Sequence, residues 1–194
     1  ALRTFGLEPS KKTILILGGS LGARTINDSV MAHLDELQNS GVQVIWQTGK
    51  NYFENIKQQL AEKSPMPALK PTDFIADMGA AYRAADLVIS RAGASSISEF
   101  CLIGKPVILV PSPNVAEDHQ TKNAMALVNR QAAQFVSDAE APQKLIPLAL
   151  STVKNDQILG QLSHNIKLMA LRNSAETIAN EVFALAEKQA NKKR

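Results

Sequence analysis

Short runs of apolar residues alternate with longer amphipathic segments along most of the chain. The apolar runs predict buried strands, and the segments between them carry apolar residues at helical spacing. The predicted strands are 13–17, 42–46, 70–74, 86–90, 106–110 and 133–136. The predicted helices are 23–38, 52–61, 78–84, 96–103 and 118–129, followed by 143–153, 158–170 and 175–189.

This alternation is typical of βαβ units, in which each helix connects two parallel strands. Runs such as 14–17 and 107–110 are apolar at every position, as expected for strands covered on both faces. The sequence therefore predicts an α/β fold, a mostly parallel sheet of about six strands with helices on both faces. Ligands of such sheets bind beyond the carboxyl ends of the strands, so the loops there should hold the site.

Length and composition limit the possible classes of protein. The 194 residues fit a single domain, with 1–12 as a linker remnant and 190–194 as a frayed basic tail. No apolar run is long enough to span a bilayer, and no signal peptide is recognisable. A single cysteine, Cys101, rules out an internal disulfide, and the first residue, Ala1, suggests a piece of a longer protein. With 5% aromatic residues and no basic stripe between them, nucleic-acid binding is not expected.

The segment from Arg91 to Glu99 contains the strongest candidate chemistry. A turn of small residues around Gly93 follows the fourth predicted strand and opens onto a helix. The unpaired N–H groups and positive dipole end of such a helix suit a phosphate. Glu99, one turn inside, can accept hydrogen bonds from the vicinal hydroxyls of a sugar. Two alternatives stay open: Ser96 and Glu99 also match a capping box, and Arg91 either pairs with phosphate or holds backbone carbonyls of the loop.

A glycine-rich loop follows the first predicted strand. Its sequence, Gly-Gly-Ser-Leu-Gly at 18–22, offers backbone N–H groups and the Ser20 hydroxyl to a phosphate. The alternative is a tight turn that needs glycine for its geometry. The spacing differs from the G-x-G-x-x-G fingerprint, and no acidic residue ends the second strand, which argues against a dinucleotide site.

Two further strand ends carry candidates. Ile75, after the third strand, could pack on a base whose edge meets the exposed backbone, although a core position is the simpler explanation. His119 and Gln120 begin the helix after the fifth strand, where they are well placed for sugar hydroxyls. No histidine has partners at metal-ligand spacing, so no metal site is predicted.

Four motifs occur in order: Gly18–Arg24, Phe74–Met78, Arg91–Glu99, and His119-Gln120-x-x-Asn123-Ala124. Together they resemble the C-terminal half of the MurG family, the bacterial N-acetylglucosaminyltransferases of peptidoglycan synthesis that convert lipid I to lipid II. The similarity runs from about residue 12 to 185. The resemblance implies a glycosyltransferase-B architecture, in which two Rossmann-like halves enclose the reaction and the C-terminal half binds UDP-N-acetylglucosamine.

The resemblance implies that Ile75 contacts the uracil and that Glu99 accepts hydrogen bonds from the ribose hydroxyls. Ser20 and the turn at 94–96 would contact the diphosphate. Gln120, with His119 and Asn123, would contact the N-acetylglucosamine hydroxyls. The donor-binding set implied is Ser20, Ile75, Arg91, Gly93, Ala94, Ser95, Ser96, Glu99, His119, Gln120 and Asn123.

The resemblance also implies what this chain lacks. The lipid-linked muramyl-pentapeptide acceptor, the catalytic base and the membrane-facing patch belong to the family's N-terminal half. The chain alone should bind donor without catalysis and without metal or cofactor. The intact enzyme would invert the sugar's anomeric carbon on the cytoplasmic face of the inner membrane. Two alternatives stay open: the donor subunit of a two-chain transferase, as in the split eukaryotic enzyme for dolichol-linked sugars, and an NAD-binding module.

Overall fold

A computed structural model describes residues 1–114 and 118–191 of the chain. These residues form a parallel sheet of six strands in the order β3-β2-β1-β4-β5-β6. The strands are β1 Thr13–Leu17, β2 Gln43–Gln47, β3 Leu69–Thr72, β4 Leu87–Ser90, β5 Val107–Leu109 and β6 Gln134–Phe135. The predicted α/β class and parallel sheet are confirmed.

Helices cover both faces of this sheet. They are α1 Arg24–Ala32, α2 Leu34–Asn39, α3 Phe53–Ala61, α4 Met78–Ala84, α5 Ala94–Ile103, α6 His119–Val128, α7 Ala141–Val153, α8 Asp156–Leu168 and α9 Ser174–Asn191. Ile14 and Ile16 of β1 join a core with α1, α2 and α7, whereas Leu15 and Leu17 join a second core with α4, α5 and α6. Because neighbouring residues of a strand point to opposite faces, a strand with both faces covered must be apolar throughout.

The order of the strands creates a crevice between β1 and β4. The chain proceeds from β1 outward to β2 and β3, then returns to place β4 beside β1 and proceeds the other way. The loops after β1 and β4 therefore leave the sheet in opposite directions, which opens space at their carboxyl ends. Both glycine-containing candidate loops lie at this point.

The expected helix 23–38 is wrong as a single helix, because it is interrupted at His33. The ring nitrogen Nδ1 of His33 lies 3.0 Å from the Ser29 carbonyl oxygen, which would otherwise accept the backbone N–H of His33. That N–H instead donates to Val30 at 3.1 Å. The side chain competes with its own backbone, and the helix restarts as α2. The ends of the other predicted elements differ from the observed ones by at most two residues, and β1 and α4 agree at both ends.

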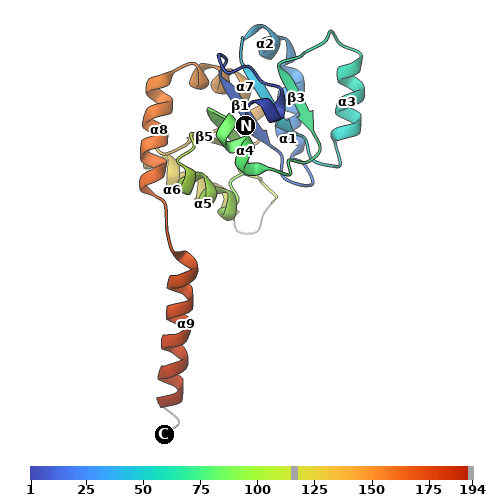
Figure 1. The fold of residues 1–194 in the computed structure, drawn as a ribbon. Coiled ribbons are helices and arrows are strands. Elements are labelled where there is room, and N and C mark those ends of the chain that lie inside the picture. Colours follow the sequence, from blue (N-terminus) through green and yellow to red (C-terminus); the bar gives the residue numbers. More distant parts are fainter. Residues whose placement is uncertain (115–117, 192–194) are drawn as a thin grey trace.

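The two ends of the chain differ in how they relate to the core. Within residues 1–12, a short 3-10 helix η1 spans Arg3–Phe5 and Leu7 is buried. Helix α9 projects away from the rest of the chain (Figure 1), and it exposes the apolar side chains Ile178, Val182, Phe183 and Leu185. Of the predicted frayed tail 190–194, residues 192–194 lie outside the described part. No helix of the described part is long and apolar enough to cross a membrane.

Candidate functional site

A cavity of about 290 Å³ opens at the carboxyl ends of β1 and β4. Its lining draws on the loops after β1, β3 and β4 and on α4, α5 and α6. Of the predicted site residues, it brings together Ile75, Arg91, Gly93, Ser96, Glu99 and Gln120. Segments far apart in sequence therefore meet where the strand-end rule places a ligand.

The N-terminus of α5 forms one wall of this cavity. The helix begins at Ala94, two residues before the predicted start, because extended Gly93 is its N-cap and accepts the N–H of Ile97 at 3.0 Å. No side chain caps this end. Among the described residues, the backbone N–H groups of Ala94, Ser95 and Ser96 have no acceptor. The turn thus offers unpaired donors at the positive end of a helix dipole, a favourable place for an anion.

Glu99 does not form the capping box that its spacing allowed. Its Oε2 accepts the hydroxyl hydrogen of Tyr82 on α4 at 2.8 Å, so this alternative is wrong. Tyr82 is buried, and its ring meets Phe100 edge to face with centroids 5.9 Å apart. Glu99 itself is exposed along the cavity, and its Oε1 has no partner among the described residues. Tyr82 therefore holds Oε2 of the carboxylate, while Oε1 can accept a hydrogen bond from a ligand.

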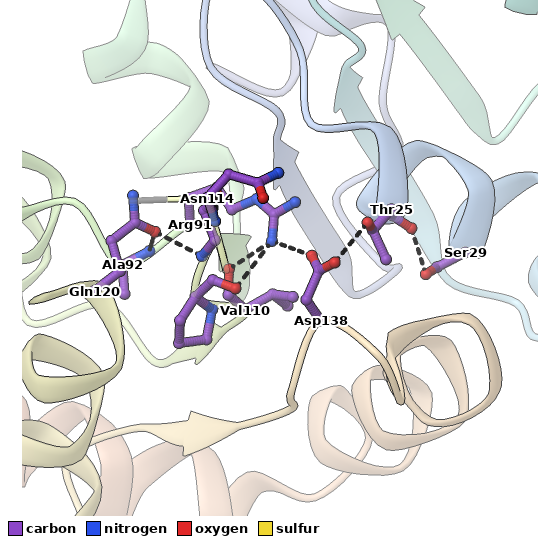
Figure 2. Close-up of polar contacts among 10 residues, drawn as sticks. Thr25, Ser29, Arg91, Ala92, Val110, Asn114, Gln120 and Asp138 are labelled. Atoms are coloured by element: carbon purple, nitrogen blue, oxygen red, sulfur yellow. Dashed lines mark hydrogen bonds and ion pairs between the residues drawn. The ribbon is translucent and has the colours of Figure 1, made fainter. Parts of the chain in front are cut away.

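Arg91 holds the strand-end loops together. Its Nη1 donates to the carbonyl oxygens of Val110 at 3.1 Å and Pro111 at 3.2 Å, and it pairs with Asp138 (Figure 2). Asp138 in turn accepts the hydroxyl hydrogen of Thr25 on α1 at 2.9 Å. Of the two roles left open, the structure shows the bonds to backbone carbonyls. Contact with a phosphate stays a prediction for the other guanidinium N–H groups.

Two amide side chains of α6 hold the turn before α5. Oε1 of Gln120 accepts the N–H group of Ala92 at 3.2 Å (Figure 2) and that of Ser112 at 2.9 Å. Nδ2 of Asn123 donates to the Ala92 carbonyl at 3.2 Å. Because two N–H donors fix the orientation of the Gln120 amide, its NH₂ group is left as a donor without a partner in the described part.

The glycine-rich loop after β1 lies against the backbone at the end of β2 and in the loop that follows it. A Cβ on Gly18 would lie 2.9 Å from the Gln47 carbonyl oxygen, and one on Gly49 would lie 2.1 Å from the backbone nitrogen of Gly22. Glycine is therefore required by the geometry of the turn, as one alternative held. Ser20 is exposed within this loop.

Of the predicted residues, Ser20, Ala94, Ser95, His119 and Asn123 are not among those that line the cavity. His119, the first residue of α6, is exposed and has an interaction of its own within the chain. Ala94 and Ser95 are exposed on the first turn of α5. Ile75 is only 4% exposed, but its backbone N–H and C=O have no partners among the described residues.

Several residues of the site were missed from the sequence. Tyr82 and Gln47 line the cavity, and Asp138 with Thr25 supports Arg91. Tyr82 could have been noticed in the sequence, because it carries the one hydroxyl group of a helix made mostly of small residues. Nothing in the sequence pairs Thr25 with Asp138, because they are far apart in the chain. No three His, Cys, Asp or Glu side chains of the described residues gather as metal ligands.

Comparison with known proteins identifies relatives over nearly the whole chain. Residues 13–178 match the family described as the glycosyltransferase family 28 C-terminal domain. A protein of Phocaeicola vulgatus is 62% identical over 188 residues, 97% of this chain and 50% of its own length. A Porphyromonas gingivalis protein is 52% identical over 194 residues, 98% of this chain and 51% of its own length. Both are named UDP-N-acetylglucosamine–N-acetylmuramyl-(pentapeptide) pyrophosphoryl-undecaprenol N-acetylglucosamine transferase.

A solved structure supports the same relationship. The crystal structure of Acinetobacter baumannii MurG matches 94% of this chain with a TM-score of 0.79 and 28% identity, and the match covers 52% of that chain. It confirms the predicted Rossmann-like half of a glycosyltransferase-B fold. The chain spans about half the length of the curated relatives it matches.

Proposed function

The chain belongs to the glycosyltransferase family 28 C-terminal domains, and we propose that it is the donor-binding half of a peptidoglycan N-acetylglucosaminyltransferase. The donor would be UDP-N-acetylglucosamine, and the complete enzyme would convert lipid I to lipid II. One observation carries the proposal. Unpaired hydrogen-bonding groups of α5, Glu99 and Gln120 surround one cavity, in a chain 62% identical to a transferase of that name.

The diphosphate of the donor would lie at the N-terminus of α5. The N–H groups of Ala94, Ser95 and Ser96 supply unpaired donors, and Gly93 leaves room for close approach. The Ser20 hydroxyl, on the facing loop, would contact the same group. Such an arrangement suits a doubly charged group because the donors and the helix dipole act together.

The uridine would lie along the α4 side of the cavity. Glu99 would accept hydrogen bonds from the two ribose hydroxyls, since a carboxylate has several acceptor positions and Tyr82 occupies one. The base edge would meet the unpaired backbone groups of Ile75. Phe74, 51% exposed next to it, offers an aromatic face at the rim.

The sugar would lie toward α6. The NH₂ group of Gln120 would donate to an N-acetylglucosamine hydroxyl, with His119 and Asn123 as further contacts. Because Gln120 and Asn123 also hold Ala92, the residues that contact the sugar would position the turn that binds the diphosphate.

Reaction would require the half of the enzyme that this chain does not contain. There, a hydroxyl of the lipid-linked muramyl-pentapeptide would attack the anomeric carbon and invert it while the bond to UDP breaks. The N-terminus of α5 would stabilise the charge that develops on the leaving diphosphate. This chain would supply no catalytic acid or base, and we expect no metal ion or cofactor. Because the acceptor is lipid-linked, we expect the whole enzyme to act at the cytoplasmic face of the inner membrane.

Calorimetric titration of the chain tests the proposal. UDP and UDP-N-acetylglucosamine should bind saturably, and Glu99→Ala should weaken UDP binding by more than about ten-fold because hydrogen bonds to a charged group are lost. Glu62→Ala, at an exposed glutamate after α3, is the matched control and should bind like the parent chain.

Two results would contradict the proposal. One is a folded chain that binds no uridine nucleotide, and the other is NAD binding as tight as UDP binding. Transferase activity of the chain without another subunit would contradict the assignment of the catalytic groups to the other half.

A further inference from the structure

Tyr82 connects the interior of the domain to the cavity. The residue is only 9% exposed, and its ring meets that of Phe100 of α5 edge to face. Its hydroxyl reaches the Glu99 carboxylate at the cavity wall, with 2.8 Å between the oxygens. A rigid, buried side chain of α4 therefore fixes the direction of an exposed side chain of α5.

An exposed glutamate otherwise samples several rotamers, and binding a ligand would have to restrict them. The bond from Tyr82 selects one orientation in advance and occupies a single acceptor position on Oε2. Oε1 and the second position on Oε2 are left for a ligand. Two neighbouring hydroxyls can then be accepted side by side.

We propose that Tyr82 is a positioning residue that orients Glu99 for a vicinal diol, and that it thereby gives the donor site its preference for a ribose nucleotide. This inference rests on the proposed function, because it assigns Glu99 to the ribose. It adds a determinant of sugar selectivity that does not itself contact the nucleotide.

The hydroxyl of Tyr82 stays a donor under working conditions. Burial, together with the adjacent Glu99 carboxylate, raises the pKa of Tyr82 well above its ordinary value. The simpler alternative is that the bond only joins α4 to α5. That alternative predicts a loss of stability without any change in selectivity among nucleotides.

The test compares UDP with 2′,3′-dideoxyuridine diphosphate, which lacks both ribose hydroxyls, by calorimetry on the full chain. Tyr82→Phe keeps the ring against Phe100 and removes only the hydroxyl. It should weaken UDP binding about five-fold, the effect of one lost orienting hydrogen bond, and change dideoxyuridine diphosphate binding less than two-fold. Tyr52→Phe removes the other tyrosine hydroxyl of the chain and should alter neither affinity.

A second variant covers the case in which Tyr82→Phe does not fold. Tyr82→Met keeps an apolar side chain in the buried position and removes the hydroxyl without changing Glu99, so it should show the same selective loss for UDP. Equal weakening of both nucleotides, or of neither, would overturn the role of Tyr82 while leaving donor binding intact. Absence of UDP binding by the parent chain would overturn this inference together with the proposed function.

Discussion

The amino and carboxyl edges of the sheet use polar side chains in different ways. At the amino edge, the charged groups pair with one another. Lys12 lies 2.7 Å from Asp156 and 3.7 Å from Asp86, and Asp86 accepts the backbone N–H of Thr13 at 2.8 Å. At the carboxyl edge, Glu99 and Gln120 each use one group to hold the protein and have another without a partner among the described residues.

This contrast separates a binding site from a structural cluster of the same residue types. Polar groups at the ends of strands are normally hydrogen-bonded within the protein. Groups that lack such partners and face one cavity are therefore the ones available to a ligand. The amino edge also has a cavity, of about 270 Å³, but its lining is mainly apolar, with Leu37, Val42 and Met66 among its residues.

The largest expected effect comes from adding a methyl group where two carboxyl-edge loops touch. Gly49 has φ +83°, and a Cβ there would lie 2.1 Å from the nitrogen of Gly22. Gly49→Ala should lower the free energy of unfolding by about 3 kcal/mol, because strain and overlap add. Urea unfolding measures this loss, and UDP binding should weaken with it.

Gly41→Ala at the amino edge is the matched control. Gly41 has a similar φ of +74° but no atom within 4 Å of its added Cβ. It should lose only about 1 kcal/mol of stability and keep its UDP affinity. Equal losses in the two variants would show that the close approach of the loops does not matter.

A smaller effect is expected from the network that supports Arg91. Asp138→Asn removes the charge that Arg91 contacts, while the bonds from Arg91 to the Val110 and Pro111 carbonyls persist. The free energy of unfolding should fall by about 1–2 kcal/mol, since both side chains are mostly buried. UDP binding should weaken a few-fold because the turn before α5 becomes less fixed.

A neighbouring charge provides the control for this network. Glu140 lies two residues after Asp138, and its exposed carboxylate pairs with Lys144. Glu140→Gln removes the charge of that carboxylate. It should unfold at the same urea concentration as the parent chain. If Asp138→Asn behaves like Glu140→Gln, the network does not support the site.

The smallest effect is expected at the amino edge. The hydrogen bond from Lys12 to Asp156 raises the pKa of Lys12, with burial opposing and Asp86 adding to the increase. A raised pKa stabilises the fold below the ordinary value of 10.5, and this contribution is lost as pH rises through the higher folded value. Lys12→Met should therefore cost less than about 1 kcal/mol at pH 8, because the pair is exposed to solvent.

Urea unfolding at pH 8 and above pH 11 checks this expectation. The difference between the parent chain and Lys12→Met should shrink at the higher pH, and UDP affinity should be the same in both. A loss of UDP affinity in Lys12→Met at pH 8 would contradict the separation of the two edges.

Much of the fold could be predicted from local patterns. The fully apolar strands and the amphipathic segments between them determine the sheet and the helices, since burial on both faces demands that pattern. The break at His33 could not be predicted, because it depends on a side-chain ring competing for the Ser29 carbonyl. The start of α5 at Ala94 likewise follows from the extended backbone of Gly93 rather than from the Ser-x-x-Glu spacing.

The site could be predicted in part, for a similar reason. Glycine turns and strand ends place Gly93, Ser96 and Glu99 at one edge of the sheet without knowledge of tertiary contacts. Partnerships across long sequence distances are not encoded in any spacing, as Tyr82 with Glu99 and Thr25 with Asp138 show. Those contacts determine which polar atoms are hydrogen-bonded within the protein and which can bind a ligand.

We propose that the unpaired groups at the carboxyl edge bind a uridine diphosphate. Titration of the ¹⁵N-labelled chain with UDP, followed through its backbone amide signals, tests it most directly. We expect saturable shifts at Ile75, Ala94, Ser95 and Ser96, with the amide of Thr13 at the amino edge unchanged. Shifts centred on the amino edge, or none at all in a folded chain, would contradict it.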